Sequence, residues 1–298
     1  MGSKRSLSQW KLLTSVVLGV ILACTIISSS SIYLDSLEEI ALNLAIDGDT
    51  AQEHDLILQA KAGPVSQSQN SLLNKTVSDA LFSEIGNLEK NRFTAIKSST
   101  FFVTNPESKG NFGGNRNRGY FVSLPSINNH INIISGTDSQ VLQYHQDKTV
   151  FFTALIPHEA ADLFQLNVGD TIVASPTDKD LYENVVVEIS GIFERNDSGQ
   201  NIWYLEEEIL EASTGSLFTT IPFYISESIF LNDLGPSFGK LEGNYIWYID
   251  VNTGIISATK TTEIRTRFQR LREHLTPALP SYSQKTSLKQ YFKNTTGD

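Results

Sequence analysis

The chain of 298 residues contains a single cysteine, Cys24, and a single methionine. One thiol cannot form an intrachain disulfide, and it cannot supply the group of cysteines that many structural zinc sites use. Cys24 also lies inside a long uncharged segment, where a thiolate would not face a soluble substrate. We therefore expect the fold to be stabilised by packing rather than by disulfides or zinc.

Motifs for nucleotide chemistry and covalent catalysis are absent too. The sequence contains no GxxxxGK[ST] phosphate loop, so ATP hydrolysis at such a site would need another chain. It contains no GxSxG nucleophile elbow, and its five histidines never occur at HxH or HxxxH spacing. We therefore expect a protein that is not an enzyme, with no catalytic residues, no bound cofactor and no metal site.

Dense clusters of basic residues are missing as well. The formal net charge is -10, although Lys4, Arg5 and Lys11 make residues 1–11 positive. The acidic remainder would repel a phosphate backbone, and no run of Lys and Arg interleaved with aromatic residues could offset that repulsion. Nucleic acid is therefore not an expected partner, and the two ends of the chain are expected to face different environments.

One long uncharged segment, residues 12–34, lies between Lys11 and Asp35. As a helix it would measure about 35 Å, which is enough to span the hydrocarbon core of a bilayer. Trp10 and Tyr33 bracket it, as aromatic residues do at membrane interfaces. We predict a single transmembrane helix here, in contact with membrane lipid.

The basic residues stand on the N-terminal side of this segment, which the positive-inside rule places in the cytoplasm. We therefore expect residues 1–11 to be cytoplasmic and residues 35–298 to form an extracytoplasmic domain at the cell membrane. A cleaved signal peptide is the alternative, since it also begins with a basic region and an apolar stretch. A lipoprotein signal at Cys24 matches poorly, because Leu22 is bulky where such signals prefer a small residue.

Apolar residues keep helical spacing beyond the predicted membrane boundary. Leu37, Ile40 and Leu44 recur at steps of three and four residues, which is typical of an amphipathic helix. The anchor is therefore expected to continue outward as a short stalk that moves together with the outer domain.

The outer region is predicted to be mainly β. Segments rich in β-branched and aromatic residues predict strands at 55–60, 93–104, 119–125, 130–135, 149–156, 171–175, 184–194, 221–231 and 244–251. Apolar stripes predict two helices, one capped by Asn70 or Ser71 and one over 261–275 that Pro277 and Pro280 end. A final helical stretch is predicted over 287–292. The expected fold class is α+β: a transmembrane helix followed by a mixed, β-rich domain of one or two subdomains.

A further helix is predicted to begin at Pro157, a position that proline tolerates at the start of a helix. After it, Gly169 and Asp170 are the candidate residues of a tight structural turn. Gly169 is predicted to adopt a positive φ that a Cβ would disfavour. Asp170 is predicted to cap this turn with its carboxylate rather than to bind a metal.

Three polar segments are better explained as solvated surface than as sites. The acidic stretch 47–55 lacks the alternate ligands and the sixth-place glycine of a calcium loop. The Gly- and Arg-containing loop 108–119 could hold an anion, but a flexible hairpin tip is the simpler interpretation. Glu206, Glu207 and Glu208 read as a hydrated face.

The order of these elements resembles the N-terminal half of a MacB/FtsX-type ABC transporter permease. The similarity rests mainly on TVFFTALIPHEAADLFQLNVGDTIVAS, residues 149–175, and on VVVEISGIFE, residues 185–194. In that family a strand leads into a short Ala/Leu helix, a glycine turn and two strands that end in a Gly-Ile-hydrophobic signature. Gly169, Gly191 and Ile192 occupy those places here.

The resemblance implies a MacB-like periplasmic core domain that performs no covalent chemistry. It implies a cytoplasmic ABC ATPase subunit as partner, a dimer of permeases, and coupling of ATPase-driven helix movement to substrate export or extraction. Such permeases have further membrane helices, so the chain is expected to be a fragment of a longer permease. Two alternatives stay open: a stand-alone membrane- or lipid-anchored binding module, and an extracytoplasmic hydrolase with an unrecognised site.

Overall fold

The computed structural model describes residues 15–21, 24, 56–105, 117–125, 127–138, 142–144, 149–176, 184–196, 213–214, 219–252 and 260–286. Residues 15–21 are helical. Most of the predicted membrane segment, the predicted helix over 287–292 and the stalk residues Leu37, Ile40 and Leu44 lie outside the described residues. Within those residues, no helix is both long enough and apolar enough to cross a bilayer.

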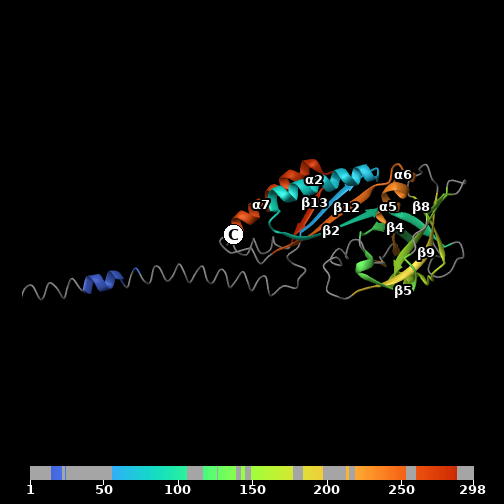
Figure 1. The fold of residues 1–298 in the computed structure, drawn as a ribbon, viewed down its shortest axis with the longest axis horizontal. Coiled ribbons are helices and arrows are strands. Elements are labelled where there is room, and N and C mark those ends of the chain that lie inside the picture. Colours follow the sequence, from blue (N-terminus) through green and yellow to red (C-terminus); the bar gives the residue numbers. More distant parts are fainter. Residues whose placement is uncertain are drawn as a thin grey trace, which may run out of the picture.

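The described part of the chain is a mixed α/β fold built on one large sheet, which agrees with the predicted β-rich character (Figure 1). Its strands are β1 Leu56–Ala62, β2 Glu89–Ser98, β3 Phe101–Thr104, β4 Asn117–Ser123, β5 Ile131–Gly136, β6 Leu142–Tyr144, β7 Thr149–Pro157, β8 Thr171–Pro176, β9 Asn184–Arg195, β10 Ser213–Thr214, β11 Thr219–Tyr224, β12 Gly243–Val251 and β13 Ser283–Thr286. The helices are α2 Gln67–Ile85, α3 His158–Phe164, α5 Glu227–Ile229, α6 Gly235–Ser237 and α7 Thr261–Ala278, with the short 3-10 helix η3 Ile127–Asn129 and the π-helical segment η5 Phe230–Leu234.

Six strands of this sheet close on themselves, and we call them the ring. Its strands pair in the cyclic order β4, β3, β8, β9, β7, β11, and β11 returns to β4 as a parallel neighbour. β7 and β9 are also parallel, whereas the other pairs in the ring are antiparallel. Closure leaves these strands without long open edges on which other strands could pair.

Aromatic side chains fill the interior of the ring. The Phe121 ring centroid lies 5.2 Å from that of Phe101, 5.6 Å from Phe223 and 6.2 Å from Phe152. Gly119 leaves no room for a larger residue here, because an added Cβ would lie 2.6 Å from Cγ1 of Val103. The ring therefore encloses a packed core rather than a channel.

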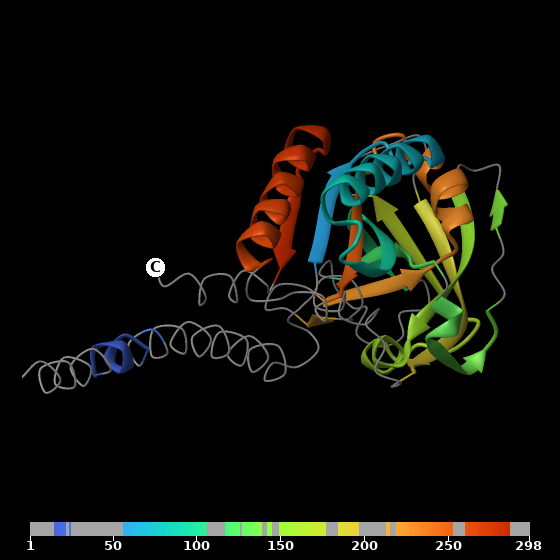
Figure 2. The same ribbon diagram turned by 60° about the vertical axis from the view of Figure 1, so that its left-hand side comes forward.

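Four further strands, β2, β12, β1 and β13, form with the helices α2 and α7 a second part, which we call the wing. β2 joins it to the ring through β4, and β12 pairs with both β2 and β1. Figures 1 and 2 show α2 and α7 side by side over one face of these strands. Their inward side chains share one buried core with the strands: Leu73, Val77, Leu81, Ile264, Phe268, Leu271, Leu56, Leu58, Trp247 and Ile249.

The turn before β8 has the geometry that the sequence predicts. Gly169 has a φ of +90°, and its backbone N–H donates to the Ile189 carbonyl at 2.9 Å. Oδ2 of Asp170 accepts a hydrogen bond from the backbone N–H of Asn167 at 2.8 Å. The carboxylate therefore closes the turn, while Gln165, with a φ of +53°, makes the left-handed end of α3.

The segment predicted as a strand over 221–231 is divided instead. β11 ends at Tyr224, and helical structure begins at Glu227. Ser226 is the N-cap, because its Oγ accepts the N–H of Ile229 at 3.3 Å. The prediction is wrong beyond Tyr224 because the serine gives the backbone a helix start that outweighs the β propensity of the residues after it.

Two predicted helix boundaries also change. The N-cap of α2 is Ser66, whose Oγ accepts the N–H of Gln69 at 3.2 Å, so Asn70 and Ser71 lie inside the helix. α7 continues through Pro277 to Ala278. It can do so because the N–H of Leu279 still reaches the carbonyl of Leu275 at 2.9 Å, which closes the last turn despite the missing proline donor.

Candidate functional site

The two ends of the described domain meet in the wing. β1 and β13 are antiparallel neighbours, and Leu56 is the partner of Thr286 in their register. The first and last strands of the described domain are therefore neighbours, with Leu56 and Thr286 at the same end of the sheet.

A short turn connects α7 to β13, the second strand of this pair. Ser281, with a φ of +49°, reverses the chain before β13, and the N–H of Lys61 in β1 donates to the Pro280 carbonyl at 3.1 Å. Tyr282 packs against the main core. Burial raises the pKa of the Tyr282 phenol above its usual value, and the charge of Arg272 opposes that rise only in part. The turn is thus anchored at both ends.

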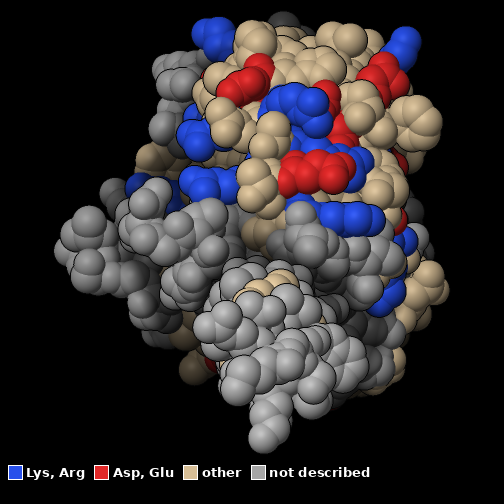
Figure 3. Space-filling view, turned by 90° about the vertical axis from the view of Figure 1, so that its left-hand side faces the viewer, with Lys and Arg blue, Asp and Glu red and all other residues tan. Residues whose placement is uncertain are grey.

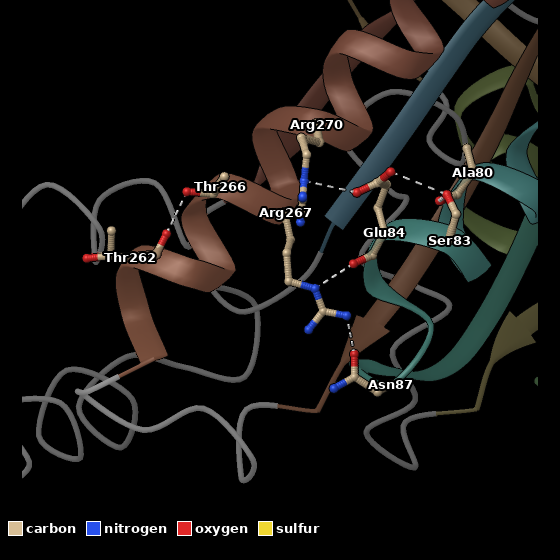
Figure 4. Close-up of polar contacts among 8 residues, drawn as sticks. All are labelled: Ala80, Ser83, Glu84, Asn87, Thr262, Thr266, Arg267 and Arg270. Carbon is tan, nitrogen blue, oxygen red and sulfur yellow. Dashed lines mark hydrogen bonds and ion pairs between the residues drawn. The ribbon is translucent and has the colours of Figure 1, made fainter.

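Arg267 joins α7 to the C-terminal end of α2, as Figure 4 shows. Its Nε donates to the backbone carbonyl of Glu84 at 2.6 Å, and its Nη2 donates to Oδ1 of Asn87 at 2.5 Å. The last carbonyls of a helix have no partners within the helix, and they carry partial negative charge. α2 has no basic residue in its last turn, so a cation from another helix fills that role.

Arg270 makes a second contact between the same helices. Its Nε lies 3.3 Å from Oε2 of Glu84 (Figure 4), and this arginine is more than half exposed. An exposed ion pair of this kind contributes at most about 1 kcal/mol. The backbone contact of Arg267 is therefore the stronger part of the α2–α7 connection.

A further arginine fixes the start of β2 beneath α2. Arg92 donates from Nε and Nη2 to the two carboxylate oxygens of Glu89 at 2.7 and 2.8 Å, and from Nη1 to Oγ of Ser78 at 2.6 Å. Bidentate pairs of this type hold both side chains in one geometry. The polar contacts of Arg92 and Arg267 thus hold α2, α7 and β2 together.

The surface on this side carries charges of both signs. Figure 3, which views the molecule from the side of α7, shows Lys and Arg side chains interspersed with Asp and Glu. No broad field of one sign appears among the described side chains on this face. This mixture is typical of a solvated surface.

The predicted structural residues lie in another part of the fold than the contacts of Arg92 and Arg267, which we call the junction. Gly169 and Asp170 form a turn of the ring, whereas the junction belongs to the wing. Sequence reasoning did not identify Arg267, because its partners Glu84 and Asn87 lie 183 and 180 residues away. Nothing in the local sequence around Arg267 indicates where its guanidinium will point.

The chain matches no protein-family model and no curated protein. It is similar to a solved structure from Porphyromonas gingivalis, named as a domain of a presumed permease protein. The identity is 13%, the match covers 78% of this chain and 89% of that chain, and the TM-score is 0.30. At that TM-score, the similarity supports no argument about the function of this chain.

Proposed function

We propose that this chain is the extracytoplasmic part of a MacB/FtsX-type ABC transporter permease. In this proposal residues 12–34 cross the cell membrane, and residues 35–298 lie outside the cytoplasm. The domain couples movement of the membrane helices, driven by a separate cytoplasmic ATPase, to export or extraction of a substrate. It performs no covalent chemistry itself.

The observation that carries the proposal is the pairing of Leu56 with Thr286. A domain whose two ends are neighbours can be held between two segments that run to the same place, here the predicted anchor and the sequence after β13. Force from both segments then enters through two adjacent strands. The contacts of Arg92 and Arg267 would pass that force to α2 and α7 as one body.

The motif order offers a second line of support. β7, α3, the Gly169 turn, β8 and β9 follow one another in the order on which the family resemblance rests. The proposed partners follow from the same resemblance: a cytoplasmic ABC ATPase subunit, membrane lipid around the anchor and a second permease copy.

The coupling role is tested by making the stalk flexible in the complete transporter. A Gly/Ser segment inserted between Leu37 and Ile40 should abolish transport while ATPase activity persists, because a flexible linker cannot pass on a directed displacement. The same segment inserted within residues 108–116, between β3 and β4, is the matched control and should preserve transport. Unchanged transport after the stalk insertion would contradict the mechanism.

A separate experiment distinguishes the permease from an anchored binding module. A permease should co-purify with an ATPase subunit from its native membrane, whereas a stand-alone module should not. A reporter fused after Asp298 should be active only outside the cytoplasm. Activity of that reporter in the cytoplasm, with the anchor intact, would reverse the proposed topology.

A further inference from the structure

A cavity of about 330 Å³ opens at one end of the ring. It lies beyond the ends of two parallel neighbours, β4 and β11, and is completed by η3 and by the residues that follow β5. A volume of this size is at the lower end of the range for small-molecule sites. The cavity is formed by described residues: Leu124, Pro125, Ile127, Asn128, Asp138, Tyr224, Ile225, Ser226 and Glu227.

The lining combines an apolar surface with two carboxylates. Leu124, Tyr224 and Ile225 are almost fully buried and supply the apolar part. Asp138 and Glu227 are half-buried, and they are the only ionisable carboxylates among the lining residues. Among the described residues, no Lys, Arg or His lines the cavity. The described lining is therefore acidic.

Neither carboxylate is neutralised within the part of the chain that the structure describes. Asp138 accepts a hydrogen bond from Nδ2 of Asn128, and Glu227 accepts one from Nδ2 of Asn70 at 2.9 Å. Both donors are neutral amides, so they satisfy one oxygen of each carboxylate and leave its charge in place. Partly buried charges of the same sign favour a cation that can approach both.

A chain of hydrogen bonds holds Glu227 in position from behind. Nε1 of Trp247 donates to Oδ1 of Asn74 at 2.7 Å, and Nδ2 of Asn74 donates to Oδ1 of Asn70 at 3.0 Å. Asn70 then donates to Glu227. All three donors point toward the carboxylate, so each bond polarises the next in the same direction. The residues that orient Glu227 thus come from β12 and α2, and they fix it before any ligand arrives.

We propose that this cavity binds a small organic cation, an ammonium group attached to a compact apolar body. The ammonium would lie between Asp138 and Glu227, and the apolar body would contact Leu124, Ile127 and Ile225. The inference does not depend on the transporter assignment, because it rests only on the cavity and its lining. An anion of the same shape is rejected by both carboxylates, and a neutral analogue leaves their charge unpaired.

The test uses three probes of similar size and shape on the full-length chain: phenethylamine, phenethyl alcohol and phenylacetate. Isothermal titration should show that the amine binds, that the alcohol binds about tenfold more weakly, and that phenylacetate does not bind. Raising the ionic strength should weaken binding of the amine, because partly exposed charges are screened. Equal binding of amine and alcohol, or no binding of the amine, would overturn the proposal.

Two isosteric variants locate the site. Glu227→Gln and Asp138→Asn should each weaken amine binding by about tenfold. Glu159→Gln, which removes an exposed acid in α3 that does not line the cavity, is the matched control and should leave the affinity unchanged. Near-UV circular dichroism checks folding, and Asp138→Asn remains informative if Glu227→Gln disturbs the hydrogen-bond chain. Unchanged affinity in Asp138→Asn would place the amine elsewhere and refute this site.

Discussion

In the ring, Phe121 packs against three other phenylalanine rings in a closed set of strands, whereas in the wing Arg267 spans two helices through polar contacts. The difference shows that one continuous sheet can be stabilised by aromatic packing in one part and partly by polar contacts in another. A closed, aromatic-filled ring cannot change shape without losing packing, because cores rearrange between discrete arrangements rather than deform smoothly. The wing receives both chain ends, and part of what holds it is a few directional contacts.

The largest effect should come from opening a void in the ring. Phe121→Ala should lower the free energy of unfolding by about 3–5 kcal/mol, since it removes a fully buried ring and leaves a cavity. Phe82→Ala, in the exposed side chain of α2 that is 84% accessible, should change it by less than about 0.5 kcal/mol. Urea denaturation measures both. Similar losses in the two variants would mean that the ring is not the dominant core.

A smaller effect is expected at the α2–α7 contact of the wing. Arg267→Ala should cost about 1–2 kcal/mol, because the Glu84 carbonyl loses its charged donor at the end of α2. Arg267→Lys should recover only part of this, since an ammonium cannot reproduce the fork that reaches Glu84 and Asn87. Arg265→Ala removes an exposed arginine from the same helix and is the control. Under native conditions, amide hydrogen exchange in α7 should become faster in Arg267→Ala but not in Arg265→Ala.

A third prediction concerns the turn at Gly169, which precedes β8 of the ring. An added Cβ would meet no atom within 4 Å, so Gly169→Ala tests conformational strain at φ +90° without a steric clash. The expected cost is about 1–2 kcal/mol, the penalty of a left-handed conformation for an L-residue. Gly169→Asn should cost less, because asparagine tolerates that region better. Equal stability of all three proteins in thermal melts would contradict the predicted role of the glycine.

The smallest effect concerns the pH dependence of the wing. Burial raises the pKa of Tyr245 to about 12, and its hydroxyl finds no hydrogen-bond partner among the described residues. Because the neutral phenol is favoured in the folded protein, this contribution is fully present below pH 10 and is lost as the pH rises toward 12. Tyr245→Phe should be as stable as the parent at neutral pH. It should also lose less stability in that alkaline range, as denaturant titrations at several pH values can measure.

Prediction from the sequence succeeded where a local pattern decides the structure. The apolar stripe of α2 and the strands around 149–157 and 184–195 appear as expected, because their side chains are buried at helical or strand periods. The Gly169 turn was also predictable, because glycine has no Cβ and adopts a positive φ more readily than other residues. The strand prediction beyond Tyr224 failed because a single serine cap outweighed a propensity that extends over several residues.

The sequence by itself determined the mixed, β-rich character of the domain, its principal helices and the Gly169 turn, because each depends on residues that are near neighbours in the chain. Only the tertiary structure decided the closure of the ring, the pairing of Leu56 with Thr286, the contact of Arg267 and the cavity beside Glu227. These features join residues that can be more than 150 positions apart. Such contacts depend on how whole elements pack, and a local sequence pattern does not indicate which distant residues it will contact.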